Sequence, residues 1–406
     1  MHDYPVLPKE GAIGRMSFYR RHRASFEAGI IASLVAYLLY ELMLAKLFSP
    51  SVAPSWFRDI GILMADSRIL VTTQRGLADY LYPPSTAVLG FLFSQLGESL
   101  AFRIHLVLEA AALIVTLVSW AAVSGLTQRP ERYLAMALAF AASLYYVRFE
   151  LKMHNINLLT LGLMSLAVLI RRRTALSGLL YGFAVCLKPY GSALLLPWML
   201  WRRQYRWSVA SGIALALFGF LLPAIWFGVA GTIRLYGGWL QALAVSGDSP
   251  MTLKSGLASF SGADLPTVGL WAKAIEIAWL AALGAFFAFR DREPPVAGLP
   301  LAAEVGAMLM APLPLGYQQP ARFAALLVPM LVIAAAATDG SRPRSQRLFL
   351  LAIMLLVGAV PWMVPLGPEL CLLSPLICFA SLLGLTIASP GIGIVRRRPR
   401  KIGTAP

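Results

Sequence analysis

The chain has 406 residues, of which 58% are hydrophobic and only 13% are charged, and its formal net charge is +16. Soluble domains have roughly 25% charged residues, so this composition excludes an ordinary soluble protein. The Lys and Arg residues stand in short clusters between long apolar stretches, not in one basic domain. This distribution favours membrane topology and excludes nucleic acid as a partner, so we expect an all-α polytopic membrane protein.

The first apolar segment covers residues 27–48 and follows the basic sequence RMSFYRRHR. Basic flanks stay in the cytoplasm, so residues 49–100 are predicted to form the first outer loop. Within this loop an apolar run after Pro83–Pro84, ending at Gly97, has about 14 residues and is too short to span a bilayer. We interpret it as interfacial or re-entrant, because counting it as a crossing would place later basic clusters outside.

The remaining apolar stretches predict about twelve spans in total, with both termini in the cytoplasm. They are residues 101–123, 131–147, 155–170, 174–187, 190–200, 207–229, 269–289, 298–314, 320–338, 347–365 and 370–389. We treat residues 1–406 as a single integral membrane domain, with a catalytic module at 27–200, additional helices and outer loops at 201–389, and a basic cytoplasmic tail at 390–406.

The predicted outer segments contain most of the polar residues that topology does not explain. They are residues 49–100, RFELKMHNIN (148–157), the turn CLKPYG, a long loop at about 230–268, and LPLGYQQPAR. Polar residues near membrane depth are costly and usually face a cavity. Five such segments therefore predict one outward-facing site assembled from several loops.

Three groups of residues in these segments form recognisable motifs. The central group is Asn157–Leu158, Ser177–Gly178 with Gly182, and Lys188–Pro189; the second is Asp59 followed by Tyr82–Pro83–Pro84; the third is APLPLGYQQPARFAALLVP. Together they make the chain from about residue 27 to residue 338 similar to glycosyltransferase family 87. The chain departs from the family motifs at His154 and Asn155, which replace Gly and Gln, and at Leu315, Tyr317 and Gln318, which replace Trp and a pair of His.

The resemblance implies a membrane protein of GT-C fold with interfacial helices in the first outer loop. It implies transfer of one hexose or pentose, mannose first, from a polyprenyl-phosphate donor to a lipid or glycan acceptor, with inversion. The expected location is the bacterial inner membrane, with the active site facing the periplasm and membrane lipids around it. Two alternatives stay open: a transporter or flippase for a lipid-linked glycan, and a catalytically silent scaffold. A transporter would predict two similar halves, and the sequence has no internal repeat.

An inverting transfer needs a base for the acceptor hydroxyl, and a carboxylate is the usual choice. The family position makes Asp59 the candidate base, although a solvated loop carboxylate or a pair with Arg58 would also explain it. Asp66 lies seven residues later, on the same face if the segment is helical, and is the second candidate for base or acceptor binding. Tyr82 is a further candidate for substrate binding, and Asp79 is interpreted as a turn residue.

The leaving group is a lipid phosphate, whose charge needs nearby cations or backbone amides. Lys188 stands in an apolar setting and either binds this phosphate or extends to the interface. His154, Asn155 and Asn157 open the outer end of a predicted helix, whose N-terminus favours an anion, unless Asn155 only caps it. Further candidates for phosphate or sugar hydroxyls are Arg234, Lys254, Tyr317, Gln318 and Arg322.

Metal ligands are not apparent from the spacing of His and Cys. The three cysteines lie in apolar segments without a paired spacing, and the other histidines, His2, His22 and His105, are distant from His154 in the sequence. We therefore expect no metal and no cofactor.

Overall fold

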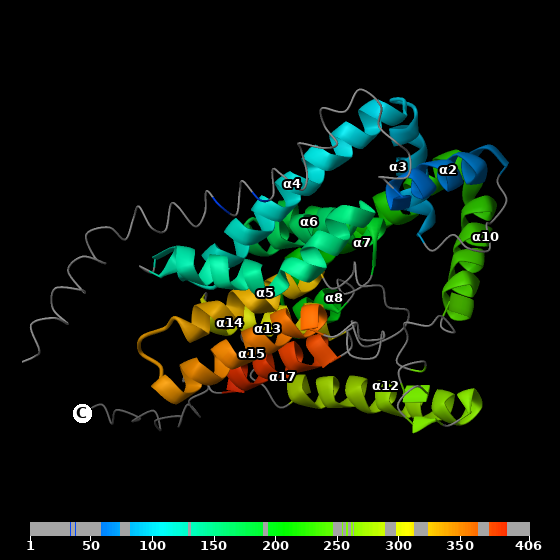
Figure 1. The fold of residues 1–406 in the computed structure, drawn as a ribbon. Coiled ribbons are helices and arrows are strands. Elements are labelled where there is room, and N and C mark those ends of the chain that lie inside the picture. Colours follow the sequence, from blue (N-terminus) through cyan, green and yellow to red (C-terminus); the bar gives the residue numbers. More distant parts are fainter. Residues whose placement is uncertain are drawn as a thin grey trace, which may run out of the picture.

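The structure is a computed structural model, and it describes residues 33, 37, 58–73, 82–128, 131–189, 194–246, 254, 257–258, 261–262, 264–288, 298–311, 324–363 and 373–387. Every regular element in this part of the chain is a helix, which confirms the all-α prediction. In Figure 1, α2, α3 and α10 gather at one end, and α4 runs from there along the other helices.

Helices follow one another along the described part of the chain. In order they are α2 (Arg58–Thr73), α3 (Pro84–Ser94), α4 (Glu98–Val123), the short η3 (Leu126–Gln128), α5 (Arg132–Met153), α6 (Asn157–Leu169), α7 (Thr174–Leu187), α8 (Leu195–Trp201), α9 (Tyr205–Ala214), the π-helical η4 (Leu215–Leu221), α10 (Leu222–Ser246), α12 (Leu265–Ala288), α13 (Leu299–Met310), α14 (Leu327–Ala337), α15 (Arg344–Met363) and α17 (Leu373–Ile387).

Several of these helices are long and apolar enough to cross a membrane, so the protein is an integral membrane protein. Among the described residues they are Glu98–Val123, Arg132–Met153, Tyr205–Ala242 and Pro266–Ala285, with five shorter apolar helices beside them. Apart from residues 33 and 37, the predicted first span at 27–48 lies outside the described residues. The count of twelve spans stays a prediction.

Two predicted outer loops are wrong in extent. Residues 148–153 belong to α5, and residues 230–246 belong to α10. The sequence signals were charged residues in the first segment and charged residues among many Gly and Ser in the second. Charged residues such as Glu150 are good helix formers, and a helix interior tolerates glycine at a cost of about 1 kcal/mol each. The short apolar run after Pro83 does form a short helix, α3, as predicted.

The centre of the bundle is α14, which is buried along its whole length. It packs against α4, α5, α13, α15 and α17. A helix that is apolar on every side is either covered by protein or surrounded by lipid, and these five neighbours cover α14 with protein. The helices around α14 therefore form the core of the fold.

Small residues let the remaining helices approach one another closely. Gly178 and Gly182, one turn apart on α7, face α9. A Cβ built on Gly178 would lie 2.6 Å from the Cβ of Ala210, and one on Gly182 would lie 2.5 Å from the Cβ of Ala214. This is the small-residue packing typical of membrane helices. The family motif residues in this segment therefore set the distance between α7 and α9.

We expect Gly182→Leu to destabilise the protein by about 1–3 kcal/mol, because its side chain cannot fit against α9. Thermal unfolding of the purified protein in detergent would measure the loss. The matched control is Gly212→Ala on α9, where a Cβ meets nothing within 4 Å. An unchanged melting temperature for Gly182→Leu would contradict this role of Gly182 in helix packing.

Candidate functional site

The first element of the site is the end of α7. Lys188 has extended backbone angles, φ −158° and ψ 105°, directly after the last helical residue. Pro189 explains this ending, because a proline disfavours helical angles in the residue before it. The extended backbone takes Lys188 away from the helix axis, and its side chain is nevertheless buried.

The carbonyl groups at the end of α7 are capped by α3. The Ser85 hydroxyl donates to the carbonyl of Cys186 at 2.7 Å, and the Thr86 hydroxyl donates to the carbonyl of Leu187 at 2.7 Å. The last carbonyls of a helix lack partners within the helix, so these bonds satisfy groups that would otherwise be buried without one. They also attach α3, in the predicted first outer loop, to the segment that carries Lys188.

Asp59, Asn155 and Lys188 form a continuous chain of hydrogen bonds. The Asn155 amide nitrogen donates to Oδ2 of Asp59 at 2.7 Å, and Nζ of Lys188 donates to Oδ1 of Asn155 at 2.8 Å. The Lys188 ammonium also lies 5.2 Å from the centre of the Tyr82 ring, in a cation–π contact. The structure thus joins residues from the first outer loop, the α5–α6 turn and the end of α7.

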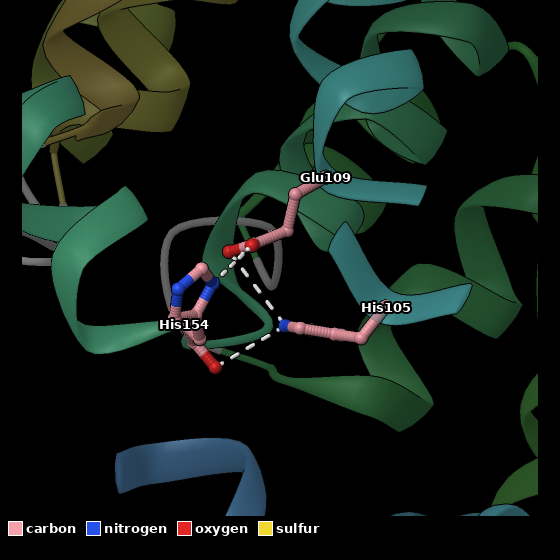
Figure 2. Close-up of side chains that lie close together, drawn as sticks. All are labelled: His105, Glu109 and His154. Atoms are coloured by element: carbon pink, nitrogen blue, oxygen red, sulfur yellow. Dashed lines mark hydrogen bonds and ion pairs between the residues drawn. The ribbon is translucent and has the colours of Figure 1, made fainter. Parts of the chain in front are cut away.

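Asn155 is held in place by the residue before it. His154 ends α5 with left-handed angles, φ 51° and ψ 50°, and is fully buried. Its Nδ1 lies 2.7 Å from Oε2 of Glu109, while its carbonyl accepts a bond from Nε2 of His105 at 3.2 Å. Figure 2 shows both α4 side chains directed toward His154. Two α4 residues one turn apart therefore fix the turn that presents Asn155.

A second buried acid, Glu150 on α5, has its carboxylate at the start of α6. Its carboxylate accepts a bond from the Asn157 side chain at 2.9 Å and from the backbone N–H of Leu158 at 3.2 Å. Free N–H groups at a helix N-terminus favour an anion, and here a carboxylate of the protein takes one of them. The helix begins after Ile156, so Asn155 is not its cap. Asn155 instead connects the carboxylate of Asp59 with Lys188.

The other predicted site residues lie in several places. Asp66 lies on α2 with Asp59, half-buried, so the predicted helix and common face are confirmed. Arg234 is exposed on α10, and the stem of Lys254 lies close to Gly269 of α12. Tyr317, Gln318 and Arg322 lie outside the described residues.

The site therefore combines the carboxylate of Asp59 with the ammonium group of Lys188. The side-chain amide of Asn155 lies between them, in a turn fixed by buried polar residues. A comparison with protein-family models matches residues 80–313 to the model described as Glycosyltransferase family 87. The match covers more than half of the chain. The chain belongs to glycosyltransferase family 87. No curated protein and no solved structure gives a significant match.

Membership of family 87 makes this protein a membrane glycosyltransferase, which uses a sugar donor and an acceptor. The matched range contains Asn155, Lys188 and Tyr82, and Asp59 precedes it. The predicted resemblance to the family is thus confirmed. Asp59, which lies outside the matched range, is connected to Lys188 inside it by the side-chain amide of Asn155.

Sequence reasoning missed Glu109 and Glu150, and it treated His105 as remote from His154. That last interpretation is wrong, since His105 bonds to the His154 backbone across 49 residues of sequence. A signal was present: His105 and Glu109 are spaced by four residues in an otherwise apolar helix, so they share a face. Ionisable residues within a membrane-spanning segment are a functional signal by themselves.

Proposed function

We propose that this family 87 protein transfers a single sugar, mannose by preference, from a polyprenyl-phosphate donor to a lipid or glycan acceptor. We place the reaction on the periplasmic side of a bacterial inner membrane, in a GT-C fold, with inversion at the anomeric carbon. The observation that carries the proposal is the chain of hydrogen bonds from Asp59 through Asn155 to Lys188.

In the proposed step, Asp59 takes the proton from the acceptor hydroxyl. The acceptor oxygen forms a bond to the anomeric carbon as the bond from that carbon to the phosphate oxygen breaks. The electron pair of the broken bond leaves with the polyprenyl phosphate, whose negative charge is stabilised by Lys188. A base and a fixed cation on opposite sides of the reacting carbon are what this displacement requires. The step takes no metal ion as a catalyst.

The Asn155 amide supports these two roles because its ends are chemically different. Its nitrogen donates to Asp59 and its oxygen accepts from Lys188, so the two groups are held apart without neutralising each other directly. A direct ion pair would engage the carboxylate that must accept a proton. The amide therefore leaves Asp59 available as a base and Lys188 available as a phosphate ligand.

The position of the basic residues on α6 and α7 supports an outer location of the site. The site is formed at the start of α6 and the end of α7, whereas the basic turn Arg171–Arg173 joins the opposite ends of these two helices. Basic turns stay in the cytoplasm, so the site end of α6 and α7 belongs outside. We assign Asp66, Arg234 and Lys254, with Tyr317, Gln318 and Arg322, to acceptor and donor binding.

The test is a transfer assay with the purified protein in lipid nanodiscs. Polyprenyl-phosphate sugars, mannose and then other hexoses and pentoses, are supplied with candidate lipid acceptors, and products are analysed by mass spectrometry and by NMR of the anomeric centre. We expect a product of inverted configuration. Failure with every donor, together with movement of a lipid-linked glycan across liposome membranes, would support the transporter instead.

We expect Lys188→Met to lower the transfer rate roughly 100- to 1,000-fold, because the leaving phosphate loses its fixed cation. The matched control is Lys152→Met, which removes an exposed lysine at the end of α5. A Lys188→Met protein with the transfer rate of the unmodified protein would exclude Lys188 from phosphate stabilisation.

A further inference from the structure

The cluster of His105, Glu109 and His154 has the composition and geometry of a metal site. His105 and Glu109 are one turn apart on α4, and His154 comes from the end of α5. The ligand atoms of the three side chains all lie within 4.8 Å of one another, with Nδ1 of His154 2.7 Å from Oε2 of Glu109 and Nε2 of His105 3.6 Å from Oε1. Figure 2 shows the three side chains converging.

These distances are close to what a small divalent cation needs. Zinc binds imidazole nitrogen and carboxylate oxygen at about 2.0–2.2 Å in tetrahedral sites, which separates neighbouring ligand atoms by about 3.3 Å. The observed separations lie on both sides of that value. Small rotations of the three side chains would therefore be sufficient to surround an ion.

One ligand atom in the cluster is left without a partner. Oε1 of Glu109 is fully buried and has no hydrogen bond among the described residues. Oε2 of the same carboxylate is bonded to His154, so the unpartnered oxygen faces His105 at a distance too long for a hydrogen bond. Buried polar atoms nearly always have a hydrogen-bond partner, whereas this carboxylate oxygen has only the 3.6 Å contact with His105, which a cation between the two groups would complete.

The charges around the cluster also favour a cation. Glu109 is fully buried, and the groups that contact its carboxylate are the imidazoles of His105 and His154. A buried charge is normally paired or coordinates a metal. Neutral imidazoles do not compensate the charge of Glu109, whereas a divalent cation held by all three side chains would.

The backbone of His154 is compatible with a ligand at this position. Its φ of 51° lies in the left-handed region, which few residues other than glycine adopt, although asparagine, aspartate and histidine do so more often than the rest. A strained backbone persists only where the surrounding structure determines it. The imidazole of His154 is directed at Glu109. This contact explains why histidine, and not glycine, is present at this position.

We propose that His105, Glu109 and His154 bind one divalent transition-metal ion, with zinc as the preferred ion. Two imidazoles and one carboxylate suit zinc rather than magnesium or calcium, which prefer oxygen ligands. Each neutral imidazole would bind the metal through a nitrogen lone pair, so the ring proton of His105 would lie on Nδ1 and that of His154 on Nε2. The backbone carbonyl of His154, 3.2 Å from Nε2 of His105, is the nearest candidate for a fourth ligand.

The ion has a structural role, because all three side chains are buried and the ligand set is closed by the protein. It fixes the turn at His154 and thereby the position of Asn155. The site is separate from the proposed sugar transfer, in which no metal acts on the anomeric carbon. Its test therefore needs no sugar donor.

The experiment uses the full chain with an affinity tag that contains no histidine, purified in detergent and stripped with a chelator. After incubation with zinc and removal of the excess, elemental analysis should find about one zinc ion per chain, as expected for a single site. Cobalt bound in place of zinc should show the absorption bands of a tetrahedral nitrogen and oxygen site. Zinc should also raise the melting temperature of the stripped protein.

Two variants remove ligands in different ways. Glu109→Gln removes the charged ligand, and His154→Gly removes an imidazole while placing glycine at a left-handed position, where it relieves strain. Both should lose the bound zinc and the cobalt bands. The controls Glu98→Gln, an exposed acid on the same helix, and His22→Gln should keep them.

The competing account is a hydrogen-bonded network without an ion. It predicts substoichiometric zinc, no cobalt bands and no thermal stabilisation in the unmodified protein, and this result would overturn the proposal. Zinc retained by a folded His154→Gly protein would also overturn it. Neither outcome decides whether the unmodified protein transfers a sugar. The zinc proposal and the transfer proposal can therefore be contradicted independently of each other.

Discussion

Asp59→Asn should lower the transfer rate by roughly 100- to 10,000-fold, the usual contribution of a general base. Asparagine has nearly the shape of aspartate, and its amide oxygen can still accept the bond from Asn155 that the carboxylate accepts at 2.7 Å. The local structure should therefore persist while the capacity to take a proton is lost. Initial transfer rates, with donor binding measured separately, would show a fall in the chemical step with donor affinity retained.

The matched control for this variant is Asp66→Asn, on the same helix and with similar partial burial. We expect it to retain far more activity and to weaken acceptor binding. An active Asp59→Asn beside an inactive Asp66→Asn would transfer the role of base to Asp66. Such a result would leave the family assignment intact and would change only the carboxylate that faces the acceptor.

Glu304→Ala should give the largest loss of stability, about 3–5 kcal/mol, because it leaves a buried arginine without its counter-ion. Glu304 on α13 is fully buried and forms an ion pair with Arg202, which is also buried. The same carboxylate oxygen accepts a bond from Nε1 of Trp198 at 2.6 Å. Thermal or denaturant unfolding in detergent would measure the effect.

The informative companion is the double variant Arg202→Met with Glu304→Met. Replacing a buried ion pair by apolar side chains of similar volume is often neutral, whereas removing one partner is not. We therefore expect the double variant to recover most of the stability that Glu304→Ala loses. Equal losses in both proteins would indicate that packing around α13, and not the uncompensated charge of Arg202, determines the effect.

The helices that sequence reasoning predicted best are those with clear ends. The predicted span 174–187 coincides with α7, because a basic turn precedes it and Pro189 stands two residues beyond its last residue. The predicted span 190–200 was less accurate, since α8 covers only Leu195–Trp201. Segment 230–246 was assigned to the predicted loop at 230–268, which holds charged residues among many Gly and Ser, yet it is helical and belongs to α10.

Site residues could be predicted where their local sequence setting is unusual or matches a family motif. Asp59 and Lys188 could be selected from their settings and from the family motif, and the structure connects them through Asn155. Glu109, Glu150 and Glu304 could not be assigned, since each depends on a partner in another part of the chain. Glu304 is 102 residues from Arg202, and no local pattern indicates a pair at that separation. The interpretation of Arg202 as a topology signal alone was incomplete for the same reason.

The turn at His154 determines how much sequence variation this part of the chain can tolerate. Its left-handed backbone admits glycine without strain, and it admits histidine because the imidazole engages a buried acid. Most other side chains would carry the strain and remove the partner of Glu109, glycine would relieve the strain but also remove that partner, and asparagine tolerates the left-handed region. A library covering every amino acid at this position should therefore favour histidine, followed by glycine and asparagine, over β-branched and bulky side chains.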